Sequence, residues 1–187
     1  MTAPLHALLL AAALFGDPQA TPAPAAPAGE QPVEAYAQSP ANAGAEPVRD
    51  PAVLRAFHGE EGVRRVAAAF VEINTHDPRI RDIFAAADTA RLKRVLGEQF
   101  CYLLGGACTY TGRDMRETHR GQGLQNADFN AVVENLQRAM EAERVPFRMQ
   151  NVLLAKLAPM QRMVVERKAP AALKSWRRRL ASLGSGR

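Results

Sequence analysis

The side chain best suited to chemistry in this chain of 187 residues is His119. It follows Met115 by four residues, a spacing that would place both side chains on one face of a helical turn. Gly121 and Gly123 punctuate the chain directly after it. A neutral imidazole in such a turn can bind a transition metal or transfer protons, although a lone histidine is more often a solvated or core residue. The spacing therefore makes His119 a candidate metal ligand, with a solvated or core histidine as the alternative.

Other catalytic patterns are missing from the sequence. It contains no GxSxG, HExxH or CxxC motif and no phosphate-binding loop. Asp114 and Glu117 stand near His119 and could form an acid–base group, but exposed loop carboxylates are far commoner. Cys101 and Cys108 have no histidine at zinc-ligand spacing. They predict either two buried thiols or, in an exported protein, a disulfide.

The elements that must position His119 are helices. Apolar residues recur at spacings of three and four, and aromatic residues are few, which predicts an all-α domain over residues 50–167. A kink is expected at Pro159. Residues 107–126 lose the periodicity and hold at most one helical turn, around His119, and such a long loop inside a domain is usually functional. Helices or helical turns are expected over residues 50–57, 60–75, 79–84, 88–104, 128–144 and 147–167.

Both ends of the chain differ in composition from the domain. Residues 1–25 contain an apolar run that is too short to span a bilayer and predicts a signal peptide, hence a periplasmic or secreted protein. No Lys or Arg precedes that run, so the alternative is a cytoplasmic protein. Residues 26–49 are rich in Ala and Pro and predict a disordered linker. The net charge of +5 lies mainly in a basic tail, residues 168–187, which could be helical over 171–183, so no nucleic-acid face is predicted.

Several short fragments, taken in order, resemble the group I truncated haemoglobins over about residues 52–166. Each fragment is common by itself, whereas their order and spacing are specific. The resemblance implies a 2-on-2 helical sandwich around haem. The fragments are Gly59-Glu60-Glu61-Gly62, Asp77-Pro78-Arg79-Ile80 with Phe84, Arg91-Leu92-Lys93, Gly105-Gly106, Tyr110-Thr111-Gly112-Arg113-Asp114-Met115, His119-Arg120-Gly121 and Leu157-Ala158-Pro159-Met160.

The resemblance also assigns roles to individual residues. It makes His119 the axial ligand of a haem b iron, bound through one ring nitrogen while the other orients the ring. Arg91 or Lys93 could meet a haem propionate, although a solvated helix face is an equal alternative. The expected porphyrin walls are apolar side chains that would suit an ordinary core equally well. They are Phe84, Leu92, Leu96, Phe100, Met115, Leu124, Phe129, Val132 and Met140.

The chain departs from the family pattern where a gas ligand would bind. Many group I members carry a Tyr after the Phe of the second helix, where this chain has Val71. A Gln often stands one turn beyond Leu92, where this chain has Leu96, and Gln99 is the nearest polar residue. Fewer hydrogen-bond donors predict weaker retention of O2. Val132 stands where other groups carry a Trp, which favours group I.

The function that the resemblance implies is reversible binding of O2, NO and CO, with NO detoxification as an open extension. NO oxidation would need a separate reductase, because the sequence shows no flavin or nicotinamide domain. The alternative is a redox, electron-transfer or weakly peroxidatic haem protein, and a third hypothesis is a haem-free interaction domain. An apolar ligand wall disfavours peroxidase chemistry because it lacks groups that move protons.

Overall fold

The computed structural model describes residues 27–166 of the chain. The predicted signal peptide (residues 1–25) and the predicted basic tail (residues 168–187) lie outside the described residues. Within the described part, no helix has both the length and the apolar character needed to cross a membrane.

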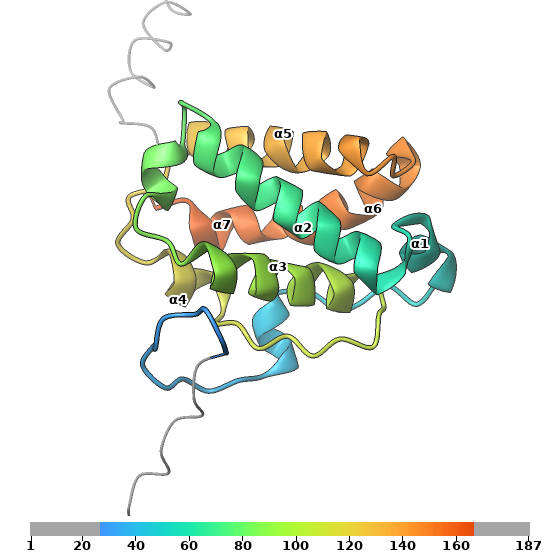
Figure 1. Ribbon diagram of the computed structural model, residues 1–187, viewed down its shortest axis with the longest axis horizontal. Helices are drawn as coiled ribbons and strands as arrows, with labels where there is room; N and C mark the ends of the chain where they lie inside the picture. Colours follow the sequence, from blue (N-terminus) through green and yellow to red (C-terminus); the bar gives the residue numbers. More distant parts are fainter. Residues whose placement is uncertain (1–26, 167–187) are drawn as a thin grey trace, which may run out of the picture.

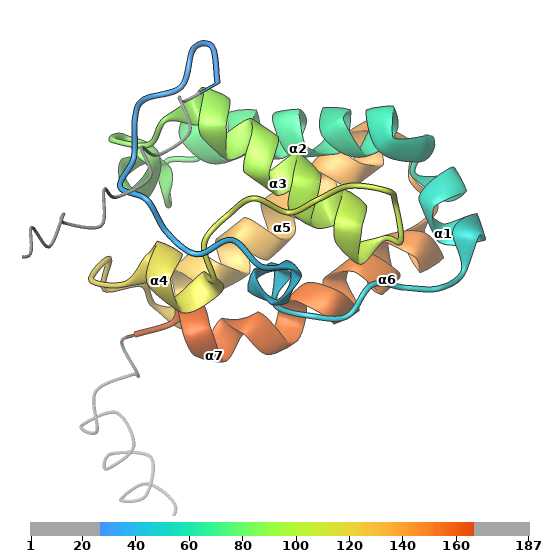
Figure 2. The same cartoon turned by 90° about the horizontal axis from the view of Figure 1, so that it is seen from below.

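Four long helices form two antiparallel pairs (Figure 1). One pair is α2 (Gly59–His76) with α3 (Thr89–Leu103), and the other is α5 (Asn126–Ala142) with α6 (Phe147–Leu157). Helix α2 packs against both α3 and α5, so the pairs cross as two layers (Figure 2). This arrangement is the predicted 2-on-2 helical sandwich. The shorter elements are η1 (Pro40–Ala43), α1 (Pro51–Ala56), η2 (Arg81–Phe84), α4 (Met115–His119), η3 (Ala158–Met160) and α7 (Gln161–Val164).

Local sequence signals set several of the helix starts and one break. The Asp50 carboxylate accepts a hydrogen bond from the Ala52 N–H before α1, and Asp88 accepts one from the Arg91 N–H at the start of α3. Helix α5 begins at Asn126, two residues earlier than the sequence predicts, because Gln125 and Asp128 form a reciprocal capping box. The expected break at Pro159 is confirmed, since the chain passes from α6 through η3 into α7 there.

A polar cluster joins α2 to α5 inside the apolar core. The Asn135 amide donates to Asn74 Oδ1 and to Asp77 Oδ2, at 2.9 Å in each case, and both asparagines are fully buried. The Arg79 guanidinium, which hydrogen-bonds both Asp77 oxygens, holds the pKa of that carboxyl well below its usual range. Arg79 also pairs with Glu134 on α5. Because each buried polar group has a partner, this cluster fixes the crossing of the two layers.

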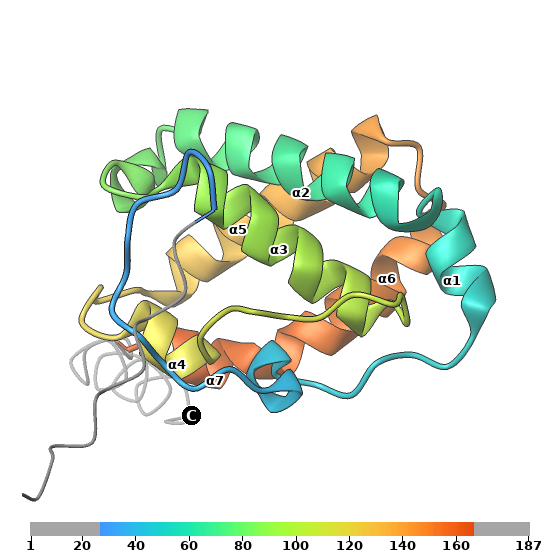
Figure 3. The ribbon, with the colours of Figure 1, turned by 60° about the horizontal axis from the view of Figure 1, so that its bottom comes forward.

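Over its described part, residues 27–49, the structure contradicts the disordered linker predicted over residues 26–49. Residues 30–48, the N-terminal strap, pass α4 and α7 and reach α1 (Figure 3). Glu30, whose side chain is only 4% exposed, pairs with Arg94 on α3. Ala43 is fully buried in the core. Further hydrogen bonds run from Gln31 N to Asp88 Oδ2, from the Tyr36 hydroxyl to Thr111 O, from Asn42 Nδ2 to Gly112 O and from Val48 N to Leu103 O.

The linker prediction failed because ordered segments were recognised by apolar residues that recur at helical or strand spacing. The N-terminal strap has no such pattern. Its attachments are instead polar tethers to single sites, together with the fully buried Ala43 and the partly buried Ala45 and Val48, which pack against the core. Such contacts leave no pattern at helical or strand spacing, so the sequence resembles a solvated segment.

Candidate functional site

Two adjoining apolar cavities lie between the helical layers, and His119 borders both. The inner cavity, of about 190 Å³, is lined mainly by α3, α5, α6 and η3. The outer cavity, of about 220 Å³, is lined by η2, the start of α3, the loop after α4 and the start of α5. Phe129 and Val164 also border both cavities. The arrangement is a long apolar slot with one imidazole at its middle.

Eight of the nine residues expected in the porphyrin walls line this slot. Leu96, Phe100 and Met115 line the inner cavity, and Phe129 borders both. The outer cavity is lined by Phe84, Leu92, Leu124 and Val132.

The ninth expected wall residue, Met140, is corrected by the structure. It lines neither cavity and is fully buried in the core. Leu136, one turn earlier on α5, does line the inner cavity. The slot therefore ends one helical turn before Met140, which the periodicity of α5 could not reveal because both positions lie on the same inward face.

Several other wall residues were not assigned to the site from the sequence. Phe70, Val133 and Val164 belong to the inward stripes of their helices, and each lines the inner cavity. Their spacing gave the right signal, since a slot for an apolar ligand and a filled core have the same pattern. Thr118 and Gln122 on the outer cavity were missed because they lie in the segment without periodicity.

The imidazole of His119 is held in one orientation by its own helix. The ring Nδ1 lies 2.8 Å from the carbonyl oxygen of Met115, so Nδ1 carries the proton and donates it to that oxygen. The other ring nitrogen then keeps a free lone pair. Burial lowers the pKa of His119, with the Met115 carbonyl and the Glu166 charge acting in the opposite direction. A neutral, oriented imidazole with a free lone pair is the form that binds metal ions.

Comparison with known proteins identifies the family. The family model for bacterial-like globins matches residues 53–166. The chain belongs to the bacterial-like globins. Globins are haem proteins, which agrees with the apolar slot and its single histidine.

Individual relatives of this globin are group 1 truncated hemoglobins. The protein from Mycolicibacterium paratuberculosis is 30% identical over 102 residues, which cover 54% of this chain and 75% of that protein. The Synechocystis protein is 33% identical over 92 residues, covering 47% of this chain and 74% of that protein. The match to the Tetrahymena pyriformis protein, at 32% identity, covers 42% of this chain and 64% of that protein's length.

Solved structures share the fold of this globin. The truncated hemoglobin of Tetrahymena pyriformis in its Fe(III) form superposes with a TM-score of 0.59 at 23% identity, covering 62% of this chain and 98% of that one. The 2/2 hemoglobin of a Synechococcus species, in the cyanomet state with covalently attached heme, gives a TM-score of 0.57 at 22% identity, with 62% and 98% coverage. At these identities the likeness concerns the helical arrangement.

The side of the slot where a gas ligand would bind departs from the resemblance in detail. Val71 is buried but lines neither cavity, whereas its neighbour Phe70 does. Leu96 lines the inner cavity as expected. Gln99 is the inner cavity's one polar wall residue besides His119, and its Nε2 donates to the Ala43 carbonyl of the N-terminal strap at 3.0 Å. The same Nε2 lies 3.8 Å from Met115 Sδ and 3.9 Å from Met160 Sδ, so the amide donates to the strap and to methionine sulfur.

Two basic residues of this globin that the sequence offered for a propionate are engaged elsewhere. The Arg91 guanidinium donates to the Tyr36 hydroxyl at 2.8 Å, and Lys93 Nζ lies 3.7 Å from a Glu72 carboxylate oxygen. Neither Arg91 nor Lys93 lines either cavity.

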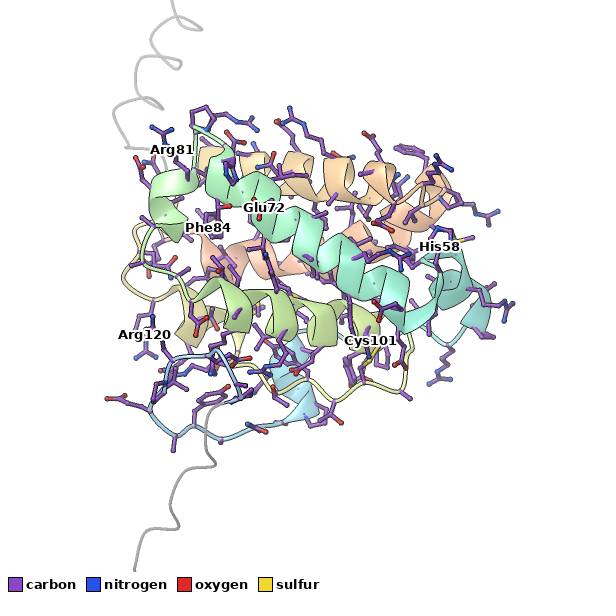
Figure 4. All side chains as sticks on the ribbon, in the orientation of Figure 1. His58, Glu72, Arg81, Phe84, Cys101 and Arg120 are labelled. Atoms are coloured by element: carbon purple, nitrogen blue, oxygen red, sulfur yellow. A yellow bond between two sulfur atoms is a disulfide. The ribbon has the colours of Figure 1, made fainter. Side chains whose placement is uncertain are left out.

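The cysteines form a disulfide between Cys101, near the end of α3, and Cys108 in the following loop. Of the two alternatives left open by the sequence, the structure has the bonded pair. Figure 4 places Cys101 and His58 away from the end of the molecule that holds Phe84 and Arg120. The disulfide thus supports the start of the loop that leads to His119, and neither cysteine lines the slot.

Proposed function

We propose that this globin holds haem b in the slot, with His119 as the axial iron ligand, and that it binds O2, NO and CO reversibly. The observation that carries the proposal is one neutral, hydrogen-bonded imidazole bordering two adjoining apolar cavities. The walls fit the group, because a porphyrin presents wide apolar faces and a polar edge. Phe84, Phe100 and Phe129 offer apolar surface, and the outer cavity also carries Thr118 and Gln122.

When bound, the group would supply an iron atom that can bind a diatomic ligand. The protein would hold that iron through His119, and the cavity walls would surround the site at which the diatomic ligand binds. The Met115 carbonyl accepts from His119 Nδ1 and orients the ring, while burial lowers the pKa of His119 and so favours the neutral imidazole. A neutral axial imidazole suits reversible ligand binding.

The wall opposite the imidazole supports fast release of O2. Among the described residues that line the slot there is no Tyr, Arg or Lys, and the Gln99 amide donates to the Ala43 carbonyl and to the sulfurs of Met115 and Met160. Bound O2 is polar and gains from a hydrogen bond, whereas this wall is mainly aliphatic and aromatic. The composition of the inner cavity also disfavours peroxidase chemistry, which needs a side chain that moves protons, because the one carboxylate in the slot lining, Asp128, borders only the outer cavity and caps α5. NO detoxification at this site would draw electrons from a separate reductase, which is the partner we propose for that activity.

Absorption spectra test the haem proposal. Protein produced with ample haem should show a Soret band that moves when the reduced protein is exposed to CO. His119→Ala should lose most of the band, and added imidazole should restore part of it. His76→Ala is the matched control, because that side chain is 75% exposed and lies at the end of α2. Colourless wild-type protein, or a band unchanged in His119→Ala, would contradict the proposal.

We also propose that the protein works in the periplasm or outside the cell. The Cys101–Cys108 disulfide supports this location, because disulfides persist in oxidising compartments and are rare in the cytosol. Expression of the full chain in a bacterial host should give a periplasmic product whose mass lacks the leader. A full-length product confined to the cytosol would contradict the proposal.

A further inference from the structure

The turn that follows His119 has an unusual backbone. Gly121 and Gly123 have φ angles of 77° and 63°, in the left-handed region that favours glycine. Alternation of such residues with ordinary ones can direct successive N–H groups to one side and create a concave site for an anion. A side chain at Gly121 would meet nothing within 4 Å, so the backbone angle rather than crowding calls for glycine there.

The anion in this turn belongs to the protein itself. Gly121 N–H donates to Glu166 Oε1 at 2.6 Å, and Gly123 N–H donates to Glu166 Oε2 at 2.9 Å. The Glu166 N–H in turn donates to the carbonyl of Leu124 at 3.1 Å. Three hydrogen bonds therefore join the chain just after α7 to the residues that follow His119. Figures 2 and 3 show α4 beside α7, in agreement with the contacts between these helices.

Helix α4 needs outside support because it has only five residues. A helix so short is unstable by itself, since nucleation costs more than a few hydrogen bonds return. Asp114 holds its first turn by accepting from the Glu117 N–H at 2.8 Å. The helix ends at His119. Shortly after it, the N–H groups of Gly121 and Gly123 are held by the Glu166 carboxylate.

We propose that Glu166 is a positioning residue for the His119 imidazole. Its carboxylate fixes the turn of Gly121 and Gly123 and thereby the tilt of the ring in the slot. Val164, two residues earlier, borders both cavities together with His119, so the same short segment forms part of the wall and anchors the turn. Charge-assisted hydrogen bonds are stronger than neutral ones, which suits a ligand that must keep one orientation. This role rests on the proposed haem function.

The experiment uses Glu166→Ala, Glu166→Gln and a matched control, Glu117→Gln. Glu117 is an acid on α4 itself, and its side chain pairs with Arg120 at 3.3 Å on the surface. In the reduced, ligand-free holoprotein, Glu166→Ala should broaden and lower the iron–histidine stretching band measured by resonance Raman spectroscopy. Transfer of haem to excess apomyoglobin should be about tenfold faster, as expected for losing charge-assisted hydrogen bonds. Glu166→Gln should fall between Glu166→Ala and wild type.

The control and the apoprotein separate this role from general stability. Glu117→Gln should leave the Raman band and the haem transfer rate unchanged. In apoprotein, Glu166→Ala should speed amide hydrogen exchange at Gly121 and Gly123 while the α2 amides stay protected. Wild-type values for the Raman band and haem transfer in Glu166→Ala, or unchanged glycine exchange, would overturn the proposal. If wild-type protein takes up no haem, the proposed function fails, and the exchange rates still decide whether Glu166 holds the turn.

Discussion

At the scale of residues, two side chains define the chemistry of the slot: the His119 imidazole and the Gln99 amide, which donates to the N-terminal strap. His119 is oriented by its own helix through the bond from Nδ1 to the Met115 carbonyl, whereas the sequence spacing predicts only that the two side chains share a helical face. Gln99 could have been a hydrogen-bond donor to a gas ligand, but its Nε2 is bonded to the Ala43 carbonyl. The sequence could place Gln99 on the inward face of α3, yet it could not show where the donor points, because its partner lies far away in the chain.

A donor placed in the aliphatic wall should slow O2 release. We expect Leu96→Gln to lower the O2 dissociation rate by about tenfold, since a hydrogen bond to a polar ligand contributes roughly 1 kcal/mol or slightly more. Stopped-flow replacement of O2 by CO measures this rate. Leu96→Met, which changes the shape of the wall without adding a donor, is the control. Slow O2 release from wild-type protein, or equal rates in the two variants, would show that the wall does not limit O2 retention.

Helices and loops were not equally predictable at the scale of elements. The start of α3 and the break at Pro159 follow from caps and proline, which act on near neighbours. The N-terminal strap and the Glu166 contact were missed, because each depends on a partner far away in the chain. The same limit applies to the slot, whose walls were predicted as inward stripes while its end, one turn before Met140, was not.

The N-terminal strap should be fastened by charge. Hydrogen bonding to Arg94 lowers the pKa of Glu30, partly opposed by burial, so the folded form binds a proton less readily than the unfolded form. We expect Glu30→Gln to cost about 1 to 3 kcal/mol of unfolding free energy near neutral pH, as for loss of hydrogen bonds to a charged partner.

The pH dependence of this stabilisation gives the test. The contribution of Glu30 is present above the ordinary Glu pKa of about 4.3 and is lost as pH falls through the lower pKa of the folded state. Urea unfolding of wild type and Glu30→Gln at several pH values measures the difference, which should shrink toward the acid end. A difference that is absent near neutral pH, or that grows in acid, would contradict the assignment.

At the scale of the whole molecule, the described residues form a two-layer sandwich that is held together by several attachments between its elements. The Asn135 cluster joins α2 to α5, the Cys101–Cys108 disulfide closes the loop after α3, and the N-terminal strap crosses from α3 toward α1. The fold class was predictable because helical periodicity covers the long helices. Whether the cysteines are bonded was not, because seven residues of separation suit both a bonded and a free pair.

Loss of the disulfide should lower global stability and leave the slot in place. Closing a loop this short is worth about 2 kcal/mol in the chain-entropy description. We expect the double variant Cys101→Ser with Cys108→Ser, and wild-type protein under a reducing agent, to lose similar amounts of unfolding free energy in urea. The Soret band, compared in the reduced CO-bound form so that the iron is in the same state in every sample, should stay as in wild type, because neither cysteine lines the slot. A large spectral change on loss of the disulfide would mean that the loop after α3 helps to position the His119 imidazole, contrary to this prediction.

The N-terminal strap also changes how the boundary of this globin should be drawn. Family similarity begins at residue 53, yet Ala43 is fully buried and its carbonyl holds the Gln99 amide. A fragment trimmed to the similar region would uncover the apolar surface beneath Ala43, release the arginines that Glu30 and Tyr36 restrain, and return the Gln99 donor to the inner cavity. Oxygen affinities measured on such a shortened protein would then describe a more polar chamber than the one the longer chain builds.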